Sequence, residues 1–110
     1  MPREDRRILF DYSEVYQAIY ALCAKRDLKK PPAGAIQNIE EAEGDENTIL
    51  VHLENPQETW DPKQTVEYKR DFVAAAMMML CKGSGIPLPK TAQKSVMIHD
   101  GNIILRVLIG

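Results

Sequence analysis

The feature that most limits what this chain can fold into is a similarity between its two halves, at an offset of 58 residues. In each half an apolar helical pattern is followed by a proline and then by two stretches of strand character. Two helices share apolar spacing by chance often enough, but a Leu-Cys pair and a proline at the same offset are harder to obtain by chance. We therefore predict a duplicated helix–hairpin unit, with its halves at residues 11–54 and 61–110. The matching pairs are Val15/Val73, Ala18/Ala76, Ile19/Met77, Leu22/Leu80, Cys23/Cys81, Leu28/Ile86 and Pro31/Pro89.

Helix signals occur at the start of each half. Asp11 is a good N-cap residue, and Glu14 stands three residues later, as in a capping box. In the second half Asp61 precedes Pro62, and proline is favoured at the first helical position. Residues 72–81 are apolar on all sides of a helix, which indicates deep burial. We predict helices that begin near Asp11 and Asp61.

Two hairpins complete the pattern. Ala35–Glu43 and Thr48–Glu54 form the first, in which the leading strand is polar. Thr91–Ile109 forms the second, and its Asp100-Gly101 dipeptide indicates a type I′ turn. This turn fixes the register and puts Val96, Ile98, Ile103, Leu105 and Val107 on one face. The predicted pairs are His99 with Asn102, Ile98 with Ile103, and Val96 with Leu105.

The whole chain, residues 1–110, is expected to be one domain, because 110 residues can form a single core. The predicted class is α+β with two layers, in which an antiparallel sheet packs on two helices in the order αββ-αββ. Residues Arg6 to Phe10 are a candidate edge strand. Residues 1–7 are expected to be flexible.

Composition excludes several classes of protein. The net charge of −2 and the pI of about 5.7 are not those of a general nucleic-acid binder. The N-terminus lacks the apolar run of a signal peptide, and the longest apolar run, Phe72 to Cys81, is too short to span a bilayer. We expect a cytoplasmic protein without a membrane partner, in which Cys23 and Cys81 are reduced, buried thiols.

The segment GSGIPLPKTAQKSV, residues 83–96, contains glycines followed by Lys90-Thr91, which invites comparison with a phosphate-binding loop. That loop requires glycine immediately before the lysine, but Pro89 stands there and has no N–H to offer a phosphate. We interpret the segment as the connection between a helix and a strand. Its lysines, together with the preceding one, leave an alternative function open, a nucleic-acid-binding domain that uses Lys82, Lys90 and Lys94.

The two histidines suggest a different alternative. The predicted strand alternation puts His52 and His99 on the sheet face opposite the core, together with Arg106. Such a group could bind an anion or a small ligand, and a small enzyme built around it stays open. No third metal ligand stands at a recognisable spacing, so no metal site is predicted. The acidic stretch from Glu40 to Asn47 lacks the calcium-loop pattern and is expected to be a solvated hairpin tip.

The last strand, NIILRVLIG, is apolar on both faces. Its second face, with Met97 from the neighbouring strand, would leave apolar side chains in water, and contiguous exposed apolar surface marks an interface. We predict a protein interface there, most simply a homodimer contact. The interface residues are Met97, Ile104, Arg106 and Leu108. A row of tyrosines, Tyr12, Tyr16 and Tyr20, is either a second partner surface or the margin of the core.

The paired helix–hairpin layout resembles, in topology alone, the chemotaxis phosphatases that act on response regulators. Their helices carry an Asp/Ser-x3-Glu-x2-Asn pattern. The nearest match here, Ser13, Gln17 and Tyr20, lacks both the acid and the amide, so their activity is not carried over. No motif places a nucleophile beside an oriented base, and no catalytic residue or cofactor is predicted. The function expected from the sequence is a non-catalytic protein-interaction or regulatory module, self-associating or bound to another protein.

Overall fold

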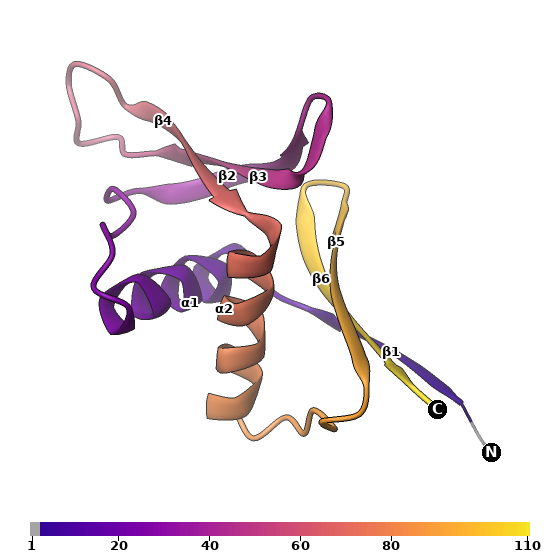
Figure 1. Cartoon of the computed structure of the whole chain (residues 1–110). Coiled ribbons are helices and arrows are strands. Elements are labelled where there is room, and N and C mark those ends of the chain that lie inside the picture. Colours follow the sequence, from indigo (N-terminus) through magenta and orange to yellow (C-terminus); the bar gives the residue numbers. More distant parts are fainter. Residues whose placement is uncertain (1–2) are drawn as a thin grey trace.

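The computed structural model describes residues 3–110, which form two helices and six strands in two antiparallel three-stranded sheets (Figure 1). The predicted α+β class is confirmed, but the strands form two sheets where the sequence predicted one. In chain order the elements are β1 (Glu4–Leu9), α1 (Tyr12–Lys25), β2 (Ala35–Ala42), β3 (Asp45–Glu54), β4 (Lys63–Lys69), α2 (Arg70–Gly83), β5 (Gln93–His99) and β6 (Asn102–Ile109).

Each sheet contains strands from both halves of the chain. The orders are β1-β6-β5 and β2-β3-β4, so each hairpin pairs with the strand that precedes the helix of the other half. The predicted N-terminal edge strand is therefore present as β1, antiparallel to β6. Glu4–Arg7 belong to this strand, whereas the sequence predicted a flexible segment over residues 1–7. Residues 1–2 of that segment lie outside the described residues.

The two helices occupy equivalent places in the chain. From Tyr12 to Arg70, and from Lys25 to Gly83, the distance along the sequence is 58 residues, the predicted offset. Four of the five matched pairs in the helices are buried on both sides, and in the fifth Leu22 is buried while Leu80 is partly buried. The unit that recurs is strand–helix–hairpin, which has one strand more than the predicted αββ, because β4 precedes α2. A common origin of the halves stays a prediction.

Helix α1 begins as predicted, with a complete capping box. The Asp11 side chain accepts a hydrogen bond from the Glu14 backbone N–H at 2.8 Å, and the Glu14 carboxylate accepts one from the Asp11 N–H at 2.9 Å. Phe10, just before the cap, is buried. The five buried helix residues are those of the predicted apolar face, Val15, Ala18, Ile19, Leu22 and Cys23.

The predicted start of the second helix at Asp61 is wrong. Residues Lys63–Lys69 form strand β4, and α2 begins at Arg70 after the N-cap residue Lys69, which makes no side-chain cap hydrogen bond. In β4 only Val66 and Tyr68 are partly buried, an alternation of period two, and both pack against the core. Because β4 pairs with β3 over residues 48–54, backbone pairing overrides the local Asp-Pro signal.

The second hairpin forms as the sequence predicted. His99 pairs with Asn102, Ile98 with Ile103, and Val96 with Leu105. On the predicted core face Val96, Ile103, Leu105 and Val107 are buried, and Ile98 is partly buried against them. The turn residues Asp100 and Gly101 have φ values of 51° and 78°, the positive values that a type I′ turn requires.

Arg70, the first residue of α2, joins the two sheets. Its Nε donates a hydrogen bond to the Glu46 carbonyl oxygen at 2.7 Å, and its terminal nitrogens donate to the Val96 carbonyl oxygen and to the Glu41 carboxylate. Glu41 and Glu46 lie in the β2-β3 hairpin and Val96 lies in β5. One guanidinium thus bridges the gap that separates the sheets.

Neither helix of the described chain has the length and apolarity needed to cross a membrane.

Candidate interaction surfaces

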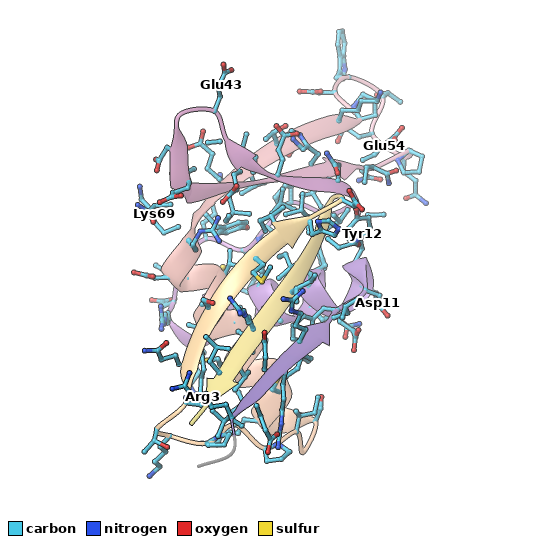
Figure 2. The ribbon with its side chains drawn as sticks, turned by 90° about the vertical axis from the view of Figure 1, so that its right-hand side faces the viewer. Arg3, Asp11, Tyr12, Glu43, Glu54 and Lys69 are labelled. Carbon is cyan, nitrogen blue, oxygen red and sulfur yellow. The ribbon has the colours of Figure 1, made fainter. Side chains whose placement is uncertain are left out.

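One face of the β1-β6-β5 sheet is turned away from the helices. Paired residues of antiparallel strands share a face, so the register places Leu9, Ile104 and Met97 in one cross-strand row. Figure 2 shows this sheet in front of the helices, with no other element of the described chain drawn over it. We call this surface the outer sheet face. It comprises Asp5, Arg7, Leu9, Gln93, Ser95, Met97, His99, Asn102, Ile104, Arg106 and Leu108.

The outer sheet face carries apolar side chains that the fold does not bury. Leu9 is 68% exposed, whereas Ile8, the next residue on the opposite face, packs against the core. Met97, Ile104 and Leu108 are half-buried and belong neither to the core nor to the partly buried residues that pack against it. All the predicted interface residues therefore lie on one surface, and Leu9 of β1 extends it.

A charged group stands beside the apolar row. The Arg106 guanidinium donates two hydrogen bonds to the Asp5 carboxylate, at 3.1 and 3.0 Å, and Arg7 lies 3.7 Å from the same carboxylate. The hydrogen bond from Arg106 lowers the pKa of Asp5, and the same contact raises the pKa of Arg106. Arg106 is thus engaged within its own sheet, and its charge is balanced by Asp5.

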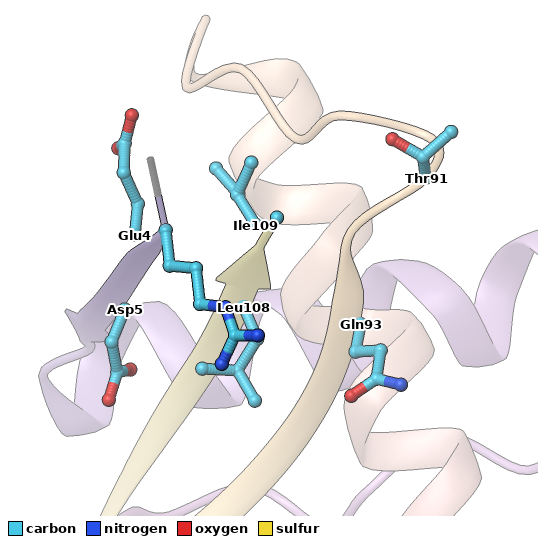
Figure 3. A pocket seen from close by; sticks show the side chains of 8 residues that line it. Glu4, Asp5, Thr91, Gln93, Leu108 and Ile109 are labelled. Atoms are coloured by element: carbon cyan, nitrogen blue, oxygen red, sulfur yellow. The ribbon is translucent and has the colours of Figure 1, made fainter. Parts of the chain in front are cut away.

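A hollow of about 580 Å³ lies at the end of this sheet, next to the outer sheet face (Figure 3). Leu108 and Ile109 of β6 line it, between Glu4 and Asp5 on the side of β1 and Gln93 on the side of β5. Its lining combines the carboxylates with the Arg3 guanidinium, the Thr91 hydroxyl, the Gln93 amide and aliphatic side chains. The hollow extends the outer sheet face to the end of the sheet.

The three lysines predicted as a nucleic-acid contact do come together. Lys82 lies in the last turn of α2, Lys90 in the following loop and Lys94 in β5. All three line a groove of about 530 Å³, which we call the lysine groove. Its other lining residues are Met78, Gly85, Ile86, Pro87 and Leu88.

The lysine groove is shaped by the way α2 ends. The backbone N–H of Ile86 donates to the Cys81 carbonyl oxygen at 2.9 Å, which turns the chain back across the last helical turn. Gly85 has a φ of 75°, a conformation that glycine adopts without strain. The residues from 84 to 92 connect a helix to a strand, as the sequence indicated, and they leave Ile86 37% exposed at the groove.

The histidines and Arg106 do not converge. His52 lies in the β2-β3-β4 sheet, where its ring contacts the Thr65 hydroxyl at 2.8 Å and Glu40 at 3.1 Å. His99 lies in the other sheet, 3.3 Å from Asp100. The hollow beside His52 contains neither His99 nor Arg106. Within residues 3–110 no group of three potential ligands could hold a metal ion. The prediction of a shared face is wrong for His52, which lies in a different sheet, whereas the strand register puts His99 and Arg106 on the same face of their sheet.

Two of the three tyrosines of the row in α1 bind other parts of the same chain. Tyr12 donates a hydrogen bond to the Gly101 carbonyl oxygen at 2.8 Å, and Tyr16 donates one to the Pro32 carbonyl oxygen at 3.0 Å. Tyr20 is 43% exposed, and the Lys30 ammonium lies 5.9 Å from the centre of its ring. This geometry favours the interpretation of the row as the margin of the core.

Two exposed apolar side chains were not singled out by the sequence analysis. Leu9 was read only as part of an edge strand, and its exposure depends on the pairing of β1 with β6, which is distant in sequence. Trp60 is 93% exposed in the loop between β3 and β4. A lone aromatic residue in the polar segment NPQETWDPK was a signal for it.

No family model, curated protein or solved structure matches this chain.

Proposed function

We propose that the protein is a non-catalytic interaction module and that its outer sheet face binds a second copy of the chain. The observation that carries this proposal is the uncovered apolar row of Leu9, Ile104 and Met97. In a monomer these side chains stay partly in water, and covering them is favourable by about 25 cal/mol for each Å² of apolar surface removed from water.

The charges of the outer sheet face support a copy of itself as the occupant. Asp5 balances Arg106, so the central charged pair presents little net charge to an approaching surface. Arg7, which is 3.7 Å from Asp5, stands at the margin, where solvent can still reach it in a complex. A twofold axis near Ile104 would stack one apolar row on the other, with the neutralised Asp5–Arg106 pair beside it and Arg7 of the edge strand at the rim, as in sheet-on-sheet packing.

The free edge of β1 is a poorer contact than the outer sheet face. Its sequence EDRRIL puts two arginines at the middle of the strand. In an antiparallel pairing of two β1 strands centred between them, Arg6 of one copy would lie opposite Arg7 of the other. Like charges directly opposite one another destabilise a strand pair.

The size of the surface predicts a weak complex. Three strands at about 4.8 Å and six residues at about 3.4 Å cover an area of roughly 300 Å². Stable interfaces bury about 800 Å² on each partner. We therefore expect reversible association in the micromolar range or weaker, suited to regulated assembly.

Sedimentation velocity over a concentration series tests the proposal. The wild-type chain should move from monomer toward dimer as its concentration rises from micromolar to submillimolar, while Ile104→Asp and Leu108→Asp stay monomeric. The matched control is Trp60→Asp, which removes an exposed apolar side chain far from the outer sheet face and should leave the dimer unchanged.

A wild-type chain that stays monomeric throughout the series would overturn the proposal. So would a dimer that both outer-face variants retain, since its contact would then lie elsewhere. Circular dichroism on each variant shows that the fold is intact, which separates loss of the contact from loss of the structure.

A further inference from the structure

The lysine groove is lined by positively charged side chains that form no ion pair with a carboxylate of residues 3–110. Lys82, Lys90 and Lys94 line it, and no acidic residue does. Among residues 3–110 none of the three lysines forms an ion pair with a carboxylate. The Lys94 ammonium has one neutral contact, to the Ala92 carbonyl oxygen at 3.4 Å. Three uncompensated cations around one groove attract an anionic ligand.

Apolar side chains line the same groove. Leu88 and Met78 are half-buried and pack against the core, so they are held in place, whereas Ile86 is 37% exposed. Pro87 between Ile86 and Leu88 restricts the backbone conformation. The ligand must therefore offer apolar groups for this surface as well as anions for the lysines.

From this combination we infer that the lysine groove binds a short acidic peptide segment of a partner protein, with apolar side chains set between carboxylates. The apolar side chains would contact Ile86 and Leu88, and the carboxylates would pair with the lysines. The lysines are set around the groove on a helix end, a loop and a strand, so a peptide with carboxylates on both sides of its apolar residues can reach them together.

The groove is less suited to other anions. Single-stranded nucleic acid binds on aromatic platforms that stack its bases, but none of the lining residues is aromatic. A small amphiphile needs a pocket that buries most of its surface, whereas Lys82, Gly85, Ile86, Pro87 and Lys90 are all exposed here. A peptide can lie along such an open surface and extend beyond it.

The test is selection of a random-peptide phage library on the immobilised full chain, followed by fluorescence anisotropy with the enriched peptides. We expect a consensus of two or more Asp or Glu residues next to Leu, Ile or Phe. The variant carrying Lys82→Glu, Lys90→Glu and Lys94→Glu should bind these peptides at least about tenfold more weakly, and raising the salt concentration should weaken wild-type binding.

Two further variants distinguish the contribution of the lysine charges to peptide affinity from the contribution of the apolar contact with Ile86. Ile86→Ser keeps every lysine and should still lower affinity several-fold. A matched control carries Lys25→Glu, Lys29→Glu and Lys63→Glu, which change the net charge equally at exposed positions outside the groove, and it should bind like the wild type.

Three outcomes would overturn the inference: no enrichment, a consensus without acidic residues, or equal binding by the groove variant and the control. A fourth such outcome concerns the binding of single-stranded oligo(dT). If it binds as tightly as the peptides and needs the same lysines, the groove is a nucleic-acid contact. The groove residues lie outside the outer sheet face, so failure here and failure of the dimer proposal are distinguishable.

Discussion

The phenol of Tyr12 donates a 2.8 Å hydrogen bond to the carbonyl oxygen of Gly101, 89 residues further along the chain. It joins the first turn of α1 to the tip of the β5-β6 hairpin (Figure 2). Asn38 of β2 lies against the same glycine. The tip therefore contacts both the helix and the other sheet, and its shape must be compatible with both.

Replacing Gly101 by alanine should destabilise the fold for two reasons. The residue has a φ of 78°, and the added Cβ would approach the Tyr12 hydroxyl, which is held by its hydrogen bond, to 3.2 Å, while the exposed Asn38 amide can turn aside. We expect the free energy of unfolding, measured by urea denaturation, to fall by about 2–4 kcal/mol. The matched control is Gly44→Ala, where φ is 75° and nothing lies within 4 Å of the added Cβ. It should cost only about 1–2 kcal/mol, and equal losses would show that the contacts at the tip do not matter.

Removing the Asp11 side chain tests the capping box of α1. Asp11→Ala leaves the Glu14 backbone N–H without its 2.8 Å acceptor and should lower the free energy of unfolding by about 1 kcal/mol. Lys69, the N-cap residue of α2, makes no side-chain cap hydrogen bond. Lys69→Ala should therefore change stability by less than about 0.5 kcal/mol. If both substitutions cost the same, the cap of α1 is not a stabilising feature.

The sequence predicted correctly the elements whose position is determined by residues close together in the chain. Asp100-Gly101 set the register of β5 and β6, and the Asp11–Glu14 box set the start of α1. The second helix was placed too early because Asp61-Pro62 also suits a loop, and only the open edge of β3 decides that residues 63–69 extend a sheet. The strands form two sheets because one edge of each hairpin pairs with β1 or β4 and not with the other hairpin, and no local pattern encodes the pairing of β1 with the distant β6.

The same distinction explains the candidate surfaces. Met97 and Ile104 were assigned to one face from strand alternation, and the hairpin register preserves that relationship. His52 and His99 were assigned to a common face by assuming one sheet, and the two-sheet topology separates them. The lysine groove could be suspected from charge alone, but its apolar lining with Ile86 depends on how the chain turns back after α2.

Arg70 should be one of the most sensitive polar residues in the chain. It donates hydrogen bonds to two backbone carbonyls and one carboxylate, and its side chain is only 21% exposed. Arg70→Ala leaves the part-buried Val96 carbonyl oxygen without this donor and removes the two exposed contacts, so it should lower the free energy of unfolding by about 1–3 kcal/mol. Arg70→Lys should recover only part of the loss, because a lysine ammonium lacks the planar fork that reaches three acceptors.

The control for Arg70 is an arginine of similar chemistry on the surface. Arg6 forms an exposed ion pair with Glu4 at 2.9 Å, and Arg6→Ala should change stability by less than about 1 kcal/mol. Urea denaturation measures the free energy of unfolding of Arg70→Ala, Arg70→Lys and Arg6→Ala and so ranks the three losses. A loss for Arg70→Ala no larger than that for Arg6→Ala would mean that the two sheets do not depend on the bridge.

Tyr68 should titrate later than an ordinary tyrosine. Burial raises the pKa of its phenol from 10.0 to about 12, since the ionised form is poorly solvated beside the core. A pKa raised by folding stabilises the folded state fully below pH 10.0, and this contribution is lost as the pH rises toward about 12. Alkaline conditions should therefore destabilise the wild type more than Tyr68→Phe, which keeps the ring stacked on Phe72 at a centroid distance of 5.5 Å.

Tyrosinate absorbance measures this titration directly. The difference between the wild type and Tyr68→Phe isolates one phenol, and circular dichroism at each pH confirms that both proteins remain folded. Near pH 11 the difference should still be small, because the Tyr68 phenol is then mostly protonated. A difference spectrum with its midpoint near 10 would place the Tyr68 hydroxyl in water, which contradicts its packing between β4 and the helices.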